Sequence, residues 1–217
     1  MRGRFIVIEG LDGAGSSTQV EQINAFLKSV GFESITTKEP SDGPFGKILR
    51  DAVEGRRVFT PELLALGFAT DRLEHMCDGS DLQEAIDKGT WVVSDRYVLS
   101  ALAYQATQGV DMDWLIEINK HVPTPDATIF VDTPVRTCLK RIQKRNSNTD
   151  DLFHRFGILS ATKKNYMEAI KHQEFVGKLI TTDGSKSVDE IKDQAIKGLV
   201  NTFRSDFGLF AELIRDL

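Results

Sequence analysis

A glycine-rich loop between a short apolar run and a helical pattern constrains the fold of this chain more than any other stretch. Residues 5–8 are apolar and mostly β-branched, which predicts a buried parallel strand. Gly10, Gly13 and Gly15 follow, and glycines let the backbone curl until successive N–H groups converge on one anion. The next helix adds about half a positive charge at its N-terminus. The stretch therefore predicts a strand, a phosphate-binding loop and a helix.

One position departs from the usual phosphate-loop pattern. Residues 10–17 fit G-x-x-x-x-G-K-[ST], except that Ser16 stands where the lysine is expected. The backbone cradle does not depend on that side chain, but the point charge on the terminal phosphates is missing. Ser17 stands where a hydroxyl that binds Mg²⁺ is expected. A glycine-rich turn that binds no ligand is the alternative interpretation of this stretch.

The rest of the chain alternates between short apolar runs and helical patterns. Further strands are predicted at residues 34–37, 91–94, 127–131 and 175–181. Thr60, Asp113 and Ser187 are expected to cap helices, and the helix after Thr60 is apolar on most sides, so we expect it to be central. The alternation predicts an α/β fold with a parallel five-stranded sheet flanked by helices, in one domain over residues 1–217.

Charge and composition exclude several classes of protein. The net charge is −5, so no broad basic surface points to nucleic acid. No apolar run approaches the ~20 residues that a membrane span requires. Cys77 and Cys138 form no C-x-x-C motif, which favours reduced thiols without a disulfide. The chain enters its first strand without a signal peptide. We therefore expect a cytoplasmic protein that binds neither nucleic acid nor membrane.

Acidic side chains stand at the ends of four predicted strands: Glu9, Glu39, Asp95 and Asp132. Ligands of open parallel sheets bind at the carboxyl ends of the strands, so we expect the site at this edge. Asp95 is followed by Arg96. A carboxylate there can orient Mg²⁺ or its water, and a guanidinium can bridge phosphates. A structural ion pair at the end of a strand is the alternative.

Arginines on predicted helices are further candidates. Phe68 and Arg72 lie four residues apart and share a helix face, where a ring and a guanidinium can hold a base. The alternative is a core phenylalanine beside a surface arginine. Arg50, judged alone, is a solvated charge.

A second arginine pair, Arg141 and Arg145, leads into a polar segment at residues 145–151, which we expect to be an exposed, mobile loop in a helical hairpin. Such a pair can stabilise a phosphoryl group in transfer. The alternative is a basic helix end that complements the helix dipole. The histidines lack metal-ligand spacing, and no Ser/His/Asp arrangement is evident.

Together these residues resemble the thymidylate kinases, which are nucleoside-monophosphate kinases of the P-loop group. The resemblance runs from Phe5 to about Ile180 and depends on the order of several short motifs. They are Glu9-Gly10-Leu11-Asp12-Gly13-Ala14-Gly15 with Ser17-Thr18-Gln19, Lys38-Glu39-Pro40 with residues 46–50, Phe68-Ala69-Thr70-Asp71-Arg72 with His75, Asp95-Arg96-Tyr97 with Ser100, Tyr104 and Gln105, and Arg141, Arg145 and Phe153. The family fold is P-loop NTPase-like with a helical lid, which would lie here at about residues 141–155.

The resemblance implies a role for each matching residue. ATP would be bound by Gly10, Gly13, Ala14, Gly15, Ser16, Ser17 and Thr18, and Mg²⁺ by Ser17 and Asp95. The acceptor dTMP would be bound by Glu39, Arg50, Phe68, Arg72, Ser100, Tyr104 and Gln105. Phe68 would stack on thymine, Arg72 would hydrogen-bond its carbonyl edge, and Arg50 would hold the acceptor phosphate. The catalytic residues would be Arg96, Asp95, Arg141, Arg145 and Asp12. A homodimer is also implied.

The implied reaction is MgATP + dTMP → ADP + dTDP, which serves dTTP synthesis. Ser16 leaves two alternatives open: a kinase of another nucleoside monophosphate or deoxynucleoside, and a nucleotide-binding protein that has lost catalysis. Phe68, Arg72 and Tyr104 argue against a purine acceptor. Phosphoryl transfer depends mainly on positioning and charge neutralisation, so a lid arginine could supply the charge that Ser16 lacks.

Overall fold

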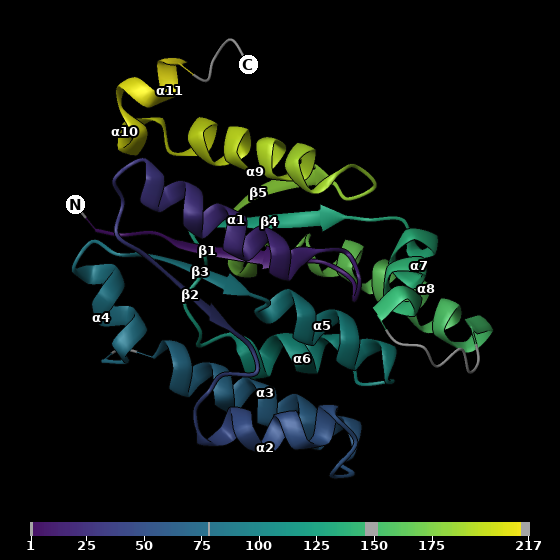
Figure 1. Ribbon diagram of the computed structural model, residues 1–217. Helices are drawn as coiled ribbons and strands as arrows, with labels where there is room; N and C mark the ends of the chain where they lie inside the picture. Colours follow the sequence, from purple (N-terminus) through teal and green to yellow (C-terminus); the bar gives the residue numbers. More distant parts are fainter. Residues whose placement is uncertain (1, 78, 146–151, 214–217) are drawn as a thin grey trace.

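A five-stranded parallel sheet forms the centre of the computed structural model, which describes residues 2–77, 79–145 and 152–213 (Figure 1). The strands are β1 (Phe5–Glu9), β2 (Ser34–Lys38), β3 (Trp91–Asp95), β4 (Ala127–Asp132) and β5 (Lys178–Asp183), in the order β2-β3-β1-β4-β5. The three central strands are buried almost throughout, because helices cover both faces of the sheet. The predicted α/β fold with a parallel five-stranded sheet is confirmed.

The helices form layers on the two faces of the sheet. They are α1 (Ser16–Ser29), α2 (Pro44–Val53), α3 (Pro61–Met76), α4 (Asp81–Asp87), α5 (Val98–Thr107), α6 (Met112–Asn119), α7 (Val135–Arg145), α8 (Leu152–Ala169), α9 (Val188–Thr202), α10 (Arg204–Phe207) and α11 (Leu209–Leu213), with a 3₁₀ turn at Gln173–Phe175. In Figure 1, α1 and α9 pack together above the sheet, and α5 and α8 pack together below it. Helix α3 packs on α5 and carries α2 on its outer side.

The strand register brings three of the four predicted acidic strand ends together. Ile8 of β1 is paired with Asp95 of β3, and Asp95 is paired in turn with Lys38 of β2. Glu9 and Glu39 each follow one residue later, so these two carboxylates and Asp95 lie along one edge of the sheet. The N–H of Glu39 also donates to the Asp95 carbonyl at 3.1 Å. This is the carboxyl edge where ligands of parallel sheets bind.

The caps predicted at Thr60 and Ser187 are confirmed, the latter as a full capping box with Glu190. The cap predicted at Asp113 is wrong. Asp111 caps α6 instead and accepts from the N–H of Trp114, because Asp111 keeps an extended backbone while Asp113 already lies in the first helical turn.

One predicted boundary and one predicted burial also differ. The last strand begins at Lys178, not at residue 175, because residues 173–175 form a 3₁₀ turn and Gly177 has a φ of +61°. Leu63 and Leu66 of α3, the helix expected to be central, lie exposed on its outer side.

Two expectations from composition can be compared with the structure. Cys77 is exposed, Cys138 is buried, and both are free thiols. Within residues 2–77, 79–145 and 152–213, no helix has the length and apolar character needed to cross a membrane.

Candidate functional site

The glycine-rich loop has the predicted geometry. It joins β1 to α1, and Gly13 and Gly15 have φ values of +80° and +101°, which residues with a side chain rarely adopt. A Cβ on Gly13 would also lie 2.6 Å from the carbonyl oxygen of Cys138, so α7 packs directly against the loop. Helix α1 begins at Ser16, which is buried, and Ser17 beside it is exposed. The N-terminus of a long helix therefore follows a curled backbone, as anion binding requires.

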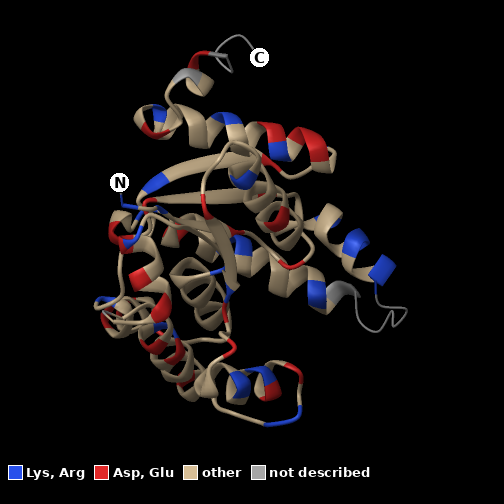
Figure 2. Ribbon diagram, turned by 60° about the vertical axis from the view of Figure 1, so that its left-hand side comes forward, with Lys and Arg blue, Asp and Glu red and all other residues tan. Residues whose placement is uncertain are grey.

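An arginine of α7 lies on this loop. Arg141 Nη1 donates to the carbonyl of Ala14 at 2.8 Å and lies 3.5 Å from that of Gly13. It also lines a cavity of about 380 Å³, which we call the loop pocket, together with Gly13, Ala14, Gly15, Thr18, Gln19, Lys144, Arg145, Val188 and Ile191. In Figure 2, blue ribbon segments mark Lys and Arg positions on the two helices that flank residues 146–151. The loop pocket thus combines curled backbone with three cations of α7.

A second cavity, of about 360 Å³, lies between α3 and α5 and is called the Phe68 pocket. It is lined by Asp12, Glu39, Pro40, Ala52, Val53, Leu64, Phe68, Arg72, Arg96, Tyr97, Ser100, Ala101, Tyr104, Gln105 and Gln108. All the predicted acceptor-binding residues except Arg50 are in this set. Apolar side chains and a ring beside a few polar groups suit a flat, polar-edged ligand.

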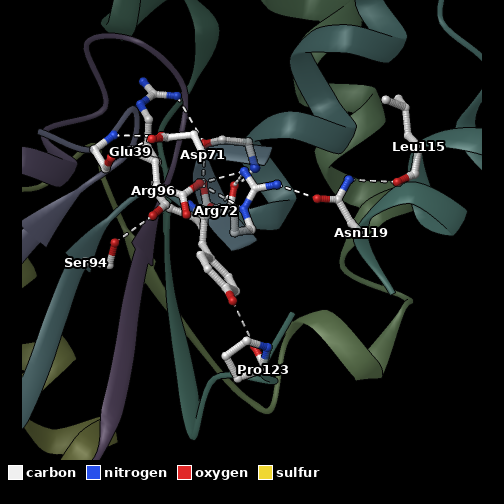
Figure 3. A network of polar contacts seen from close by, with 12 residues as sticks. Glu39, Asp71, Arg72, Ser94, Arg96, Leu115, Asn119 and Pro123 are labelled. Atoms are coloured by element: carbon white, nitrogen blue, oxygen red, sulfur yellow. Dashed lines mark hydrogen bonds and ion pairs between the residues drawn. The ribbon is translucent and has the colours of Figure 1, made fainter. Parts of the chain in front are cut away.

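Arg72 of the Phe68 pocket is buried and firmly held (Figure 3). Its Nε and Nη2 donate to Glu39 Oε2 at 2.9 and 2.6 Å, its Nη2 also reaches the carbonyl of Tyr97 at 3.4 Å, and its Nη1 donates to Asn119. These contacts use four of the five N–H groups of a guanidinium. Arg72 is thus neither a surface arginine nor a freely moving one.

Arg96, which follows β3, is the second arginine of this pocket. It has a φ of +74°, a strained conformation for a residue with a side chain and one that is concentrated at functional sites. Its Nη2 donates to Asp12 Oδ1 at 2.6 Å and its Nη1 to Ser100 Oγ at 3.2 Å, while the guanidinium lies over the ring of Tyr104. The Tyr104 hydroxyl accepts from the N–H of Asp12 at 2.9 Å, and burial raises the pKa of Tyr104 to about 12.

Glu9, at the end of β1, is fully buried behind Arg96. It accepts hydrogen bonds from the N–H groups of Tyr97 and Ser100, from the Ser100 hydroxyl and from the Tyr166 hydroxyl. Burial raises the pKa of Glu9 to about 7, against the opposing effect of these donors and of Arg96. Glu9 was predicted only as one of the acidic strand ends at the site edge. No role was predicted for Tyr166, because a tyrosine within a helical pattern has no sequence signal beyond that of a core aromatic residue.

Arg50 and Asp95, which were predicted near the acceptor and the phosphates, do not line the Phe68 pocket. Arg50 donates to the carbonyls of Pro40 and Ser41 at 3.0 and 2.7 Å and pairs with Asp42, so it holds the segment after β2. Asp95 lies at the strand edge, and its Oδ1 is buried with no hydrogen-bond partner among the described residues.

A third cavity, of about 690 Å³, adjoins the other two. It shares Asp12 and Val53 with the Phe68 pocket, and Gly13 and Arg145 with the loop pocket. Arg155 of α8 also lines it, which the sequence analysis did not anticipate. Of the predicted lid at residues 141–155, residues 146–151 and the side chain of Phe153 lie outside the described part of the chain. The three cavities thus adjoin one another between the glycine loop and Phe68.

Comparison with known proteins gives a consistent result. A family model described as thymidylate kinase matches residues 8–216. A protein of Pyrococcus abyssi named probable thymidylate kinase is 34% identical over 202 residues, covering 90% of this chain and 95% of its own. Proteins of the same name from Thermococcus gammatolerans and Methanococcus aeolicus are 36% and 35% identical, each covering 91% of this chain and 96% of its own.

Proposed function

This chain belongs to the thymidylate kinase family, and we propose that its three adjoining cavities position the two substrates of that reaction. The enzyme is a nucleoside-monophosphate kinase that transfers the γ-phosphate of ATP to dTMP, with ADP and dTDP as products. ATP would occupy the loop pocket, dTMP the Phe68 pocket, and the reacting phosphates the cavity between them. The observation that carries this assignment is the third cavity, because it shares residues with both pockets and is lined by Arg145 and Arg155.

The acceptor base would lie between α3 and α5. Phe68 offers a ring for stacking, and Arg72 has one N–H left for the carbonyl edge of thymine. Gln105 is buried, lines the same pocket, and has an Oε1 without a partner among the described residues, so this oxygen can accept from the ring N–H of thymine. Tyr104 would crowd the sugar 2′ position and favour deoxyribose, while Ser100 would face the base and Glu39 would keep Arg72 in place.

The phosphates would meet groups of both signs. Backbone N–H groups of residues 13–18 would hold the donor phosphates, as in other glycine loops at helix N-termini. Arg96, kept in place by Asp12, would bridge donor and acceptor phosphates, and Arg50 would support the acceptor phosphate through the segment that it holds. Ser16 supplies no positive charge, so Arg141 and Arg145 would neutralise the charge that develops in transfer.

The residues present also fit a magnesium ion. Mg²⁺ is usually bound through one or two carboxylates together with substrate phosphates and water, rather than in an all-protein cage. The described residues contain no cluster of three or more His, Cys, Asp or Glu that could hold a metal. Asp95, whose buried Oδ1 has no partner in the described structure, and the exposed Ser17 hydroxyl would hold the ion. When bound, it would neutralise phosphate charge.

The outer side of α2 and α3 supports a homodimer. Phe45, Ile48, Leu63 and Leu66 are each more than 40% exposed there, and adjacent exposed apolar side chains mark interaction surfaces. We name these four residues the α2–α3 face and assign to it the contact with a second copy of the chain. The free thiols of Cys77 and Cys138 support a reducing compartment, the cytoplasm.

Selectivity for the acceptor tests the proposed arrangement of the Phe68 pocket. We expect Mg²⁺- and ATP-dependent ADP release with dTMP, slower release with dUMP because the pocket has room for the 5-methyl group, and little with CMP or AMP. The assay couples ADP release to NADH oxidation, with each nucleoside monophosphate at equal concentration. Equal rates with CMP or AMP would contradict the pocket assignment. No release with any acceptor would favour a nucleotide-binding protein that has lost catalysis.

A further inference from the structure

Tyr166 connects helix α8 to the residues that hold Arg96. Its side chain is fully buried, and its hydroxyl lies 3.0 Å from Glu9 Oε2, 3.1 Å from the carbonyl of Gly10 and 2.8 Å from Ser100 Oγ. Glu9 and Gly10 belong to β1 and the start of the glycine loop, whereas Ser100 belongs to α5. One phenol thus joins three elements behind the proposed phosphate site.

Glu9 occupies the place of a helix cap. Helix α5 has no side-chain cap of its own at Tyr97, but Glu9 accepts from the N–H groups of Tyr97 and Ser100 at 2.8 and 3.2 Å. N–H groups of a first helical turn need acceptors, and the positive end of the helix dipole favours a negative charge there. A carboxylate from a neighbouring strand therefore caps the helix that begins directly after Arg96.

Arg96 depends on the same groups. Its Nη1 donates to Ser100 Oγ, and Ser100 Oγ donates in turn to Glu9 Oε2 at 2.6 Å. The backbone of Arg96 is in the left-handed region, which persists only when the surrounding contacts hold it. The contacts therefore run from Tyr166 through Glu9 and Ser100 to Arg96.

We propose that Tyr166 and Glu9 are positioning residues for Arg96: the Tyr166 hydroxyl stabilises the Glu9 carboxylate, and this carboxylate holds the first turn of α5 and, through Ser100, the guanidinium that bridges the two phosphates. The proposal rests on the proposed function for the role of Arg96 and extends it to two residues that line none of the three cavities.

The proposal predicts a specific pH dependence of kcat, because Glu9 must be a carboxylate to hold these groups. Glu9 is faced by Arg96 after β3, by Ser100 of α5 and by Tyr166 of α8, whereas Asp12 and Tyr104 contact Arg96. Burial raises the pKa of Glu9 to about 7, and the Tyr166 hydroxyl works against this rise. The carboxylate is the form that accepts from all its donors, so kcat should fall as the pH drops through this pKa. Without the Tyr166 hydroxyl the pKa rises further, and the fall should begin at higher pH.

The test compares Tyr166→Phe with Thr162→Val. Thr162 lies one turn earlier on α8 and is also buried. Its hydroxyl forms a hydrogen bond with Thr107 of α5 and does not contact Glu9. Thr162→Val therefore removes one hydrogen bond between α5 and α8 and serves as the matched control. For Tyr166→Phe we expect kcat at pH 7 to fall roughly 10-fold, KM for dTMP to change less than about twofold, and the acidic limb of kcat to move up by about one pH unit. Thr162→Val should keep the kcat and pH profile of the unmodified enzyme.

A second variant and a spectroscopic measurement complete the test. The kcat profile of Glu9→Gln should lack the acidic limb assigned to Glu9. The ¹³C carboxyl signal of Glu9 is identified by its absence from the spectrum of Glu9→Gln. This signal should titrate near pH 7 in the unmodified protein and at higher pH in Tyr166→Phe. Three results would each overturn the proposal. The first is a Tyr166→Phe variant whose acidic limb of kcat and Glu9 carboxyl signal do not move. The others are equal effects of Tyr166→Phe and Thr162→Val, and an acidic limb of kcat that is retained in Glu9→Gln. If Tyr166→Phe fails to melt cooperatively, the Glu9→Gln profile decides. Absence of dTMP-dependent ADP release from the unmodified protein counts against the proposed function alone, because the carboxyl titration does not depend on turnover.

Discussion

At the scale of single residues, Ser16 stands where the phosphate-loop pattern has a lysine, so the loop has no cationic side chain at that position. The loop keeps its curled backbone, since Gly13 and Gly15 retain left-handed conformations and α1 begins directly after them. Arg141 of α7 donates to the loop carbonyls of Ala14 and Gly13, from a position 127 and 128 residues further along the chain. A cation thus reaches the loop from a neighbouring helix.

This arrangement predicts coupling between Ser16 and Arg141. Removing a charge contact made in the transition state typically costs ~3–4 kcal/mol, or about 10²–10³ in rate. Arg141→Ala should therefore lower kcat by about that factor while KM for dTMP changes little. Ser16→Lys should restore part of the lost rate, and the double-mutant cycle of kcat measures the coupling. Arg136→Ala, which removes an exposed arginine of the same helix, is the matched control. Independent effects of Ser16→Lys and Arg141→Ala would contradict the compensation.

At the scale of elements, helix α9 is specified locally and contributes to the site at a distance. Ser187 and Glu190 form its capping box, in which the Ser187 hydroxyl accepts from the N–H of Glu190 and the Glu190 carboxylate accepts from the N–H of Ser187. The following residues Val188 and Ile191 line the loop pocket. The cap therefore determines where this wall of the pocket begins.

Loss of this cap should destabilise the protein moderately. Ser187→Ala removes an acceptor for an otherwise unpaired N–H group, which typically costs ~1 kcal/mol. For a chain of this size that corresponds to a decrease in Tm of about 2–4 °C, measured by calorimetry or circular dichroism. Ser205→Ala is the control, because Ser205 is exposed and caps no helix N-terminus. Equal Tm values for the two variants would show that the box contributes nothing to stability.

At the scale of the whole molecule, the α2–α3 face remains uncovered in a single chain. Helix α3 is apolar on most sides, and its inner side packs on α5, but Leu63 and Leu66 point away from the core. The apolar pattern of α3 therefore predicts that Leu63 and Leu66 are buried, but a single copy of the chain leaves them exposed. A second copy would remove this surface from water, at a gain of roughly 25 cal/mol for each Å² of apolar area.

Charges on this face should separate the proposed dimer. The double variant Leu63→Glu/Leu66→Glu places carboxylates where they would be buried against the partner, so sedimentation velocity should give the mass of one chain instead of two. Leu179→Glu, on strand β5 at the far edge of the sheet, is the control, since Leu179 is similarly exposed. A monomeric unmodified protein, or an unchanged mass for the double variant, would rule out a dimer through these helices.

The sequence by itself determined the features that depend on neighbouring residues. The alternation of strands and helices, the glycine loop and the acidic strand ends follow from periodicity and local backbone preferences, and so do the caps at Thr60 and Ser187. These preferences act within a few residues, which is why they could be predicted. The cap at Asp113 and the start of the last strand were wrong by two and three residues, because competing local turns decide such boundaries.

Only the tertiary structure decided which distant side chains meet. Arg72 is held by Glu39 and Asn119, which are 33 and 47 residues away, and Glu9 is reached by Tyr166 from 157 residues away. No periodicity relates such positions, since their meeting depends on the order of the strands and the packing of helices across the sheet. Burial then changes the chemistry of the groups that meet: it makes Arg72 a fixed part of the pocket wall and raises the pKa of Glu9 to about 7.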